Sequence, residues 1–483
     1  MDKLKENNSK GFAWPLPFGL VFLLLILLSL FSGNPLEWMF ASVVFVLGVR
    51  EILHINVLPI HLAFVFPFLE IVTSLADAEI NQADVNEYFY GHGSEVYTCS
   101  LAALCLVYIG WKRLARNVYV GYVSESERDL QNLSVPRLIA LYFAFQGLSI
   151  FTDFIIPYGS SIKQLEQHIG ILSSAVLAVF VWRFKSSPDQ KPVSIAFISF
   201  VLISSLFSFF SAWKGIFIIL GFALLIQPRS PSPRTIRNLA SVLGVGFLFV
   251  LTWQGIKSEY RNFLNGGTRA LVVLVSKGEG LNKFFELANR FWFEDETEAQ
   301  KTEWYNVTSG DKAFQSTLER VGYLDLFARM RQYVPSEIPH ENGALLKENL
   351  EFALIPRILN PNKGFKNDQL KVEKYARRNI ADNASFSLGH YAEHYIDFGK
   401  FGMLISLFVF GALGGGLTRF SLKGKGIMRV VDAVFCFYWM QKFFSFQFDA
   451  IKIYGQVFWA IVTYFLIWRI ILERALKWAV KSS

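Results

Sequence analysis

The densest group of polar residues with a chemical use lies in ADNASFSLGHYAEHYIDFGKFG, residues 381–402. His390, Glu393 and His394 are spaced so that they share one face of a helix. A glutamate or histidine at the outer end of a membrane helix can take a proton from an attacking hydroxyl group. Glu393 is the first candidate for such a base, and His390 is the second. The alternative is that the two histidines only line the junction between helix and membrane.

Residues 390–394 also match the pattern H-x-x-E-H, in which two histidines bind zinc and a glutamate acts as the base. Such a site needs a third protein ligand, and the only other histidine between residues 257 and 399 is His340. The three cysteines lie in apolar segments without the paired spacing of structural zinc sites. A membrane zinc protease is therefore a remoter alternative, and neither a metal nor another cofactor is expected.

Basic residues form a second group with a chemical use. Lys257 and Arg261 directly follow an apolar segment, and Arg357 and Lys363 lie in the turn-rich segment IPRILNPNKG. Snorkelling at the membrane surface and a plain surface turn are the respective alternatives. Arginine offers a planar fork that binds two phosphate oxygens at once, which suits a diphosphate group. The candidates for binding a diphosphate or glycan are Lys214, Lys257, Arg261, Arg320, Arg357, Lys363 and Arg378.

Most of the elements that must position these residues are expected to be membrane helices. Of the 483 residues, 53% are hydrophobic and 48 are phenylalanine, which is more apolar surface than a soluble core buries. Apolar stretches of about twenty residues cross a bilayer as helices because each backbone polar group is then satisfied within the helix. The fold class is therefore an all-α polytopic membrane protein with about 12 (11–13) transmembrane helices. The expected spans are residues 13–32, 36–49, 55–75, 95–111, 135–156, 168–184, 192–212, 214–228, 237–256, 400–418, 428–446 and 453–472.

Charge alternates along the chain and predicts its orientation. Lysine and arginine recur in every second connection between the apolar segments, and cytoplasmic loops are the ones that accumulate them. Both termini are therefore expected in the cytoplasm, with the first apolar segment retained as a span. The chain divides into an N-terminal bundle of about nine helices (1–256), a large outward loop (257–399) and a C-terminal bundle of about three helices (400–483). The net charge of +8 reports this topology, and no nucleic-acid partner is expected.

The outward loop is expected to contain helices of its own. Apolar residues recur at helical spacing between Phe314 and Met330 and predict a one-sided helix over residues 314–330. A second helix, over residues 344–357, ends at a proline and is expected to lie along the membrane surface. Asn383 or Ser385 is expected to cap the helix that carries His390 toward the next span.

The chain resembles the Wzy-type O-antigen and exopolysaccharide repeat-unit polymerases. The motifs that carry the resemblance are KSEYR at residues 257–261, Arg320, IPRILNPNKG, ASFSLGHYAEHYIDFGKFG and the Lys214-Gly215 pair. The motif-level resemblance covers residues 210–415, and the hydropathy profile is similar over the whole chain. The resemblance implies a metal-independent, GT-C-like membrane glycosyltransferase on the outer face of the bacterial inner membrane. Its substrates would be undecaprenyl-diphosphate-linked oligosaccharides, and it would work in the lipid bilayer with a chain-length regulator and a flippase.

Two alternatives remain open beside the polymerase. An O-antigen ligase would share the spans and the outward loop, but it would transfer the glycan from undecaprenyl diphosphate to lipid A–core. A polysaccharide or lipid transporter would need paired broken helices or internal symmetry, and the sequence contains no internal repeat.

Overall fold

The computed structural model is helical throughout the part of the chain that it describes. No strand occurs among those residues, and one isolated β-bridge joins Leu133 to Val480. The described residues are 16–54, 59–115, 129–156, 168–186, 190–206, 219–220, 233–267, 274–293, 314, 317–318, 321–355, 360, 368–379 and 387–480.

Four helical stretches are long and apolar enough, by length and composition, to cross a membrane. They are Gly93–Leu114, Val135–Thr152, His390–Ser421 and Ala450–Ala479, which coincide with the expected spans at 95–111, 135–156, 400–418 and 453–472. Shorter apolar helices lie at Val21–Phe31, Pro35–Gly48, Gly170–Phe184 and Lys191–Ser204. The expected span at 214–228 falls almost wholly outside the described residues.

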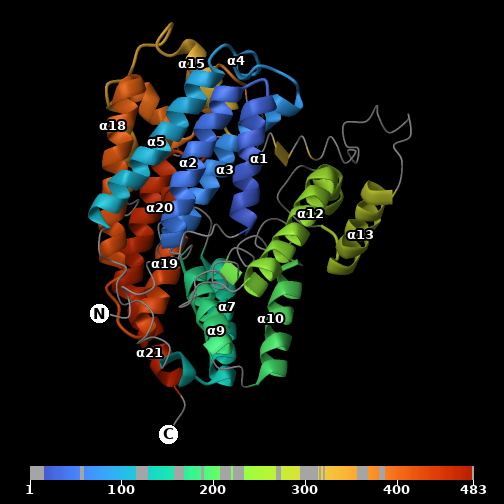
Figure 1. The fold of residues 1–483 in the computed structure, drawn as a ribbon. Helices are drawn as coiled ribbons and strands as arrows, with labels where there is room; N and C mark the ends of the chain where they lie inside the picture. Colours follow the sequence, from blue (N-terminus) through green and yellow to red (C-terminus); the bar gives the residue numbers. More distant parts are fainter. Residues whose placement is uncertain are drawn as a thin grey trace.

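The helices are arranged as a bundle with shorter helices at one end (Figure 1). The first half of the chain contributes α1 (Leu16–Phe31), α2 (Pro35–His54), α3 (Pro59–Ile80), α4 (Val85–Tyr88), α5 (Gly93–Leu114), α7 (Val135–Ile155), α9 (Gly170–Ser186), α10 (Lys191–Leu206) and α12 (Pro233–Leu264). The second half contributes α13 (Lys277–Phe293), α15 (Asp325–Tyr333), α16 (Ala344–Leu354), α17 (Asp368–Ala376), α18 (His390–Ser421), α19 (Ile427–Phe443), α20 (Ala450–Thr463), the π-helical turn η4 (Tyr464–Trp468) and α21 (Arg469–Ala479).

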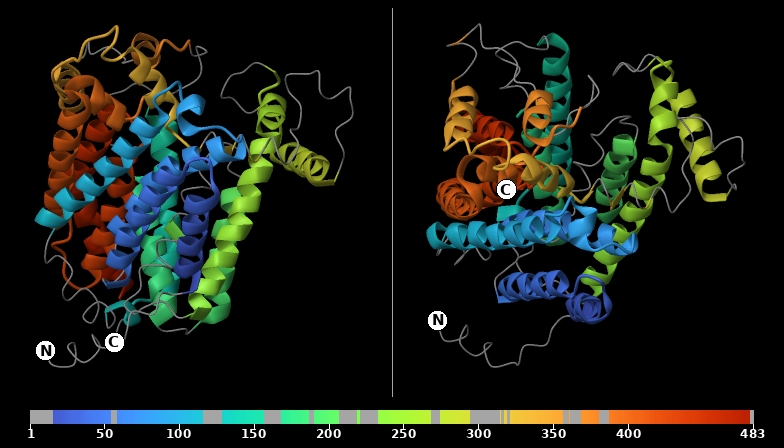
Figure 2. Two further views of the ribbon diagram at one scale, coloured as in Figure 1. Left: turned by 45° about the horizontal axis from the view of Figure 1, so that its top comes forward. Right: turned by 90° about the horizontal axis from the view of Figure 1, so that it is seen from above.

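Helices α5 and α18 share the most extensive contact among the described helices, and Figure 2 shows them crossing side by side. Gly411 and Gly415 of α18 face the backbone of α5, where an added Cβ would overlap the carbonyl oxygens of Val107 and Trp111. The Trp111 indole N–H also donates a 2.9 Å hydrogen bond to the Thr418 hydroxyl. Small residues thus allow the backbones to approach, as is common between membrane helices.

Helices α12 and α13 form a separate apolar cluster to one side of the bundle (Figures 1 and 2). Trp253 and Tyr260 of α12 pack with Leu287 and Phe291 of α13. Helix α12 continues past the expected span end at residue 256, so Lys257 and Arg261 lie on the same helix as that span.

Residues 321–355 and 368–379, here called the cap, contain α15, α16 and α17. The prediction of a single helix over residues 314–330 is wrong, because residues 322–324 are not helical and α15 begins at Asp325. The break has a tertiary cause. The backbone N–H groups of Tyr323 and Leu324 donate to the Glu70 carbonyl and the Ser74 hydroxyl of α3, both at 3.3 Å. Hydrogen bonds to a neighbouring helix replace those of a continuous helix.

Helix α18 begins later than its sequence predicts. Its N-cap is Gly389, with φ of 81°, and not Asn383 or Ser385, which lie outside the described residues. Glycine suits this position because φ is positive there and because an added Cβ would overlap the Phe446 carbonyl oxygen. A second non-helical glycine, Gly399, has φ of 65° and kinks α18 at the border between the expected loop and the expected span.

Candidate functional site

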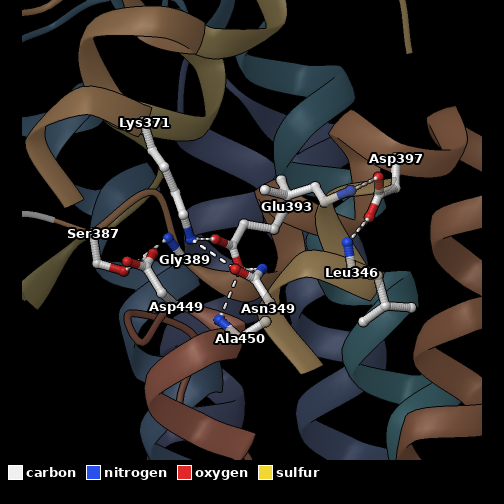
Figure 3. Close-up of polar contacts among 10 residues, drawn as sticks. Leu346, Asn349, Lys371, Ser387, Gly389, Glu393, Asp397, Asp449 and Ala450 are labelled. Atoms are coloured by element: carbon white, nitrogen blue, oxygen red, sulfur yellow. Dashed lines mark hydrogen bonds and ion pairs between the residues drawn. The ribbon is translucent and has the colours of Figure 1, made fainter. Parts of the chain in front are cut away.

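Glu393 lies in the first turn of α18 and is only 2% exposed. Both of its carboxylate oxygens have hydrogen-bond or ion-pair partners. Oε2 accepts hydrogen bonds from the Ala450 backbone N–H at 2.7 Å and from the Asn349 side-chain amide at 3.4 Å. Oε1 forms an ion pair with Lys371, and Figure 3 shows Lys371 and Ala450 converging on the carboxylate. Donors from α16, α17 and α20 therefore meet at one side chain of α18.

Lys371 is the cation that the sequence analysis missed. Its side chain is 10% exposed, and its ammonium group also donates to the Asn349 amide oxygen at 3.3 Å. The signal for it was present in the spacing of Lys371, Lys374 and Arg378, which places the three cations on one face if the helical spacing continues. The spacing does not indicate which acid each of these cations pairs with.

Asp397, one turn after Glu393, holds the start of α16. Its carboxylate accepts hydrogen bonds from the backbone N–H groups of Gly343 at 3.1 Å, Leu345 at 3.0 Å and Leu346 at 2.7 Å. The first N–H groups of a helix have no partner within the helix and favour a negative charge. This anchor fixes α16 in the position from which Asn349 reaches Glu393 (Figure 3).

Asp449 is the third buried acid of the site and is the N-cap residue of α20. Its Oδ1 accepts a hydrogen bond from the Ser387 hydroxyl, and the Gly389 backbone N–H donates to that hydroxyl at 3.2 Å. The Ser387 backbone N–H donates to the Tyr323 hydroxyl at 3.0 Å. The chain entering α18 is thereby attached to both the cap and the start of α20.

The two histidines point into the bundle. His390 is 1% exposed, and its ring packs against Tyr391 and Phe410 with centroid separations of 4.6 and 5.2 Å. Nδ1 of His394 lies 2.9 Å from the Ser406 hydroxyl. Within the described residues, no group of three or more histidine, cysteine or acidic side chains is placed to hold a metal ion. The H-x-x-E-H spacing thus gains no third ligand from the part of the chain that the structure describes.

Two further cations of the cap, Arg378 and Lys374, each lie beside an acid. Arg378 pairs with Asp325 at 3.0 Å, and Lys374 pairs with Glu341 at 2.7 Å. Hydrogen bonds from Lys374 and from the hydroxyl of Tyr375 hold the pKa of Glu341 below its ordinary value. Burial raises the pKa of Tyr375 to about 12, so this phenol remains a donor at neutral pH.

The predicted site residues are only partly brought together. Glu393 and His390 share the start of α18, and Arg378 lies in the cap with Lys371. Lys257 and Arg261 lie on α12, on the opposite side of the molecule from α18 in Figures 1 and 2. The remaining predicted cations lie outside the described residues: Lys214, Arg320, Arg357 and Lys363.

The site falls within the region of the chain that resembles a known domain family. Residues 291–477 match a domain of unknown function (DUF8712). This region contains the cap, the buried acids and helices α18 to α20. No curated protein and no solved structure matches the chain. In its described residues, the structure thus shows a helical protein with apolar helices of membrane-spanning length and a site in which three buried acids lie with Lys371.

Proposed function

We propose that the chain is a Wzy-type repeat-unit polymerase, a GT-C-like glycosyltransferase with about twelve spans in the bacterial inner membrane. Both termini lie in the cytoplasm in this proposal, and residues 257–399 lie on the outer side. The enzyme joins undecaprenyl-diphosphate-linked oligosaccharides into O-antigen or exopolysaccharide. The ligase, which would use lipid A–core as the acceptor, is the second candidate because it would need the same donor site.

One observation carries the proposal. A buried carboxylate, Glu393, and a nearly buried ammonium group, Lys371, meet at the end of a long apolar helix that the cap covers. An acid–base group and a cation are the two parts that glycosyl transfer from a lipid diphosphate requires. Their place beside an apolar helix suits a substrate whose sugar is polar and whose anchor is a polyprenyl chain.

The reaction proposed for this site is a direct glycosyl transfer. The acceptor hydroxyl oxygen forms a bond to the anomeric carbon of the donor sugar, and the bond between that carbon and the diphosphate oxygen breaks. The diphosphate leaves with the electron pair, and the hydroxyl proton passes to Glu393. Cations that neutralise the leaving diphosphate lower the barrier most in a site from which water is excluded. Membrane anchoring of both substrates raises their effective concentration.

The test is the glycan ladder of a deletion strain complemented with plasmid-borne variants. Loss of a polymerase leaves core carrying one repeat unit, whereas loss of a ligase leaves bare core. Glu393→Gln keeps the shape of the side chain but removes its ability to take a proton, so we expect it to leave one repeat unit. Glu351→Gln, on the exposed face of α16, is the matched control and should restore the full ladder. A full ladder in the deletion strain would contradict the proposed function.

A further inference from the structure

A strip of three cations runs along α17 and just past its end at Ala376: Lys371 and Lys374 lie within the helix, and Arg378 lies two residues beyond it. Each of them pairs with an acid from a different segment. The partner of Lys371 is Glu393 of α18, that of Lys374 is Glu341, and that of Arg378 is Asp325 of α15. The strip thus holds no excess charge while the protein is free of ligand. An anion that entered here would compete with these carboxylates.

The three ion pairs differ in their exposure to water. The side chains of Lys374 and Arg378 are 55% and 41% exposed, whereas that of Lys371 is 10% exposed. Exposed ion pairs contribute little and exchange readily. A buried ammonium group is destabilised when it loses its charged partner and no other negative charge replaces it. Any ligand that takes Lys371 from Glu393 must therefore itself carry negative charge.

The backbone of α17 is anchored independently of Lys371. Val372 and Ala376 are fully buried, and Tyr375 is 3% exposed and hydrogen-bonded to Glu341. The lysine side chain is long enough to change partner while this anchored face stays in place. Glu393 would likewise keep its position, because the Ala450 backbone N–H and the Asn349 amide still donate to Oε2.

We propose that Lys371 is a ligand of the substrate diphosphate and that Glu393 holds its ammonium group only until the diphosphate arrives. This inference rests on the proposed function, because it concerns the same donor substrate. Binding of the diphosphate moves Lys371 from Oε1 of Glu393 to a phosphate oxygen. Oε1 then has no ammonium donor and is open to the proton of the acceptor hydroxyl. Donor binding and the readiness of the base are thereby coupled through one lysine.

The test measures binding of farnesyl diphosphate and of inorganic pyrophosphate to the full chain in phosphatidylcholine nanodiscs, with farnesol as the neutral probe. Glu393→Gln removes the competing charge, so it should bind both diphosphates more tightly than the wild type. The double variant Lys371→Met/Glu393→Gln leaves no unpaired buried charge and should still fold. It should bind them about tenfold or more weakly than Glu393→Gln, as expected for loss of one charge-assisted contact. Lys347→Met, on the exposed face of α16, is the control and should bind like the wild type.

Equal affinity of the double variant and Glu393→Gln would overturn the inference, as would weaker binding by Glu393→Gln than by the wild type. A Lys371-dependent affinity for farnesyl diphosphate but not for pyrophosphate would show that the lipid-linked group is the ligand; the same dependence for both would show that the diphosphate alone suffices. The two proposals can fail separately. If the deletion strain loses its ladder but diphosphate binding does not depend on Lys371, only the inference about Lys371 fails. If binding depends on Lys371 but the deletion strain keeps its ladder, the polymerase proposal fails and the diphosphate site stands.

Discussion

At the scale of the single residue, the carboxylate of Glu393 has a structural role and a proposed catalytic role. It organises four helices through Lys371, Asn349 and Ala450, and it is also the first candidate for the base. These uses conflict only at Oε1, where Lys371 binds. The assignment of Glu393 as the base stays a prediction, and the proposed partner change of Lys371 would be its condition, because the structure pairs this lysine with Oε1.

Arg357 carries the sharpest prediction from the sequence, although it lies outside the described residues. Arg357→Lys keeps the positive charge but loses the fork that binds two phosphate oxygens. We expect chain extension to fall about 10- to 100-fold, since a hydrogen bond to a charged group contributes about 1.5–3 kcal/mol. Glycan length on gels, with the protein level measured in the same membranes, is the readout. The control is Arg474→Lys, on the exposed face of α21, and a strain with this variant should make chains of normal length. Chains of normal length in a strain with Arg357→Ala would show that the assignment of Arg357 is wrong.

The lowered pKa of Glu341 predicts that the stability of the cap depends on pH. Its pKa in the folded protein lies below the ordinary value of 4.5 because Lys374 and Tyr375 donate hydrogen bonds to it. The resulting stabilisation is therefore fully present above the unfolded pKa and is lost as the pH falls through the lowered folded pKa. Glu341→Gln should lower the apparent melting temperature at neutral pH, and the difference from wild type should vanish in acid.

The control for this pH dependence is Glu351→Gln. Its partner Lys347 lies 3.8 Å away, and both side chains are exposed. A difference between wild type and Glu341→Gln that stayed constant into acid would show that the hydrogen bonds, and not the charge of Glu341, hold α17.

At the scale of the element, α5 and α18 depend on glycine to approach each other. A Cβ at Gly411 would overlap the Val107 carbonyl oxygen, whereas at Gly416 the nearest atom is Leu114 Cδ1 at 4.0 Å. Gly411→Ala should therefore destabilise the protein by about 1–3 kcal/mol through overpacking. Gly416→Ala, in the same helix, should be neutral or slightly stabilising, because alanine favours helix over glycine. Thermal unfolding in detergent measures both, and equal melting temperatures would argue against close packing at Gly411.

At the scale of the whole molecule, the orientation in the membrane decides which side the site faces. The alternation of basic loops predicts that residues 257–399 lie outside and both termini inside. Reporter fusions at Asn306 and Lys423 should therefore report opposite compartments, with Asn306 outside. Finding Asn306 in the cytoplasm would reverse the topology, and it would separate the site from substrates on the outer face.

Local patterns in the sequence determined much of the helical character. Apolar runs predicted helices at the positions of α5, α18 and α20, because the backbone hydrogen bonds of such a helix join residues four apart within the same run. The same local spacing put His390 and Glu393 on one helix. It also placed the border between loop and span next to Gly399, where α18 kinks.

Only the tertiary structure decided what these residues meet. Lys371 and Ala450 lie 22 and 57 residues from Glu393 in the chain, and no spacing rule links them. Tertiary hydrogen bonds also replaced the helix expected over residues 314–330 with a break at 322–324, and the backbone around Phe446 favoured Gly389 as the start of α18. Periodicity reports which face of a helix is apolar, whereas the partner of a buried charge depends on how the helices pack.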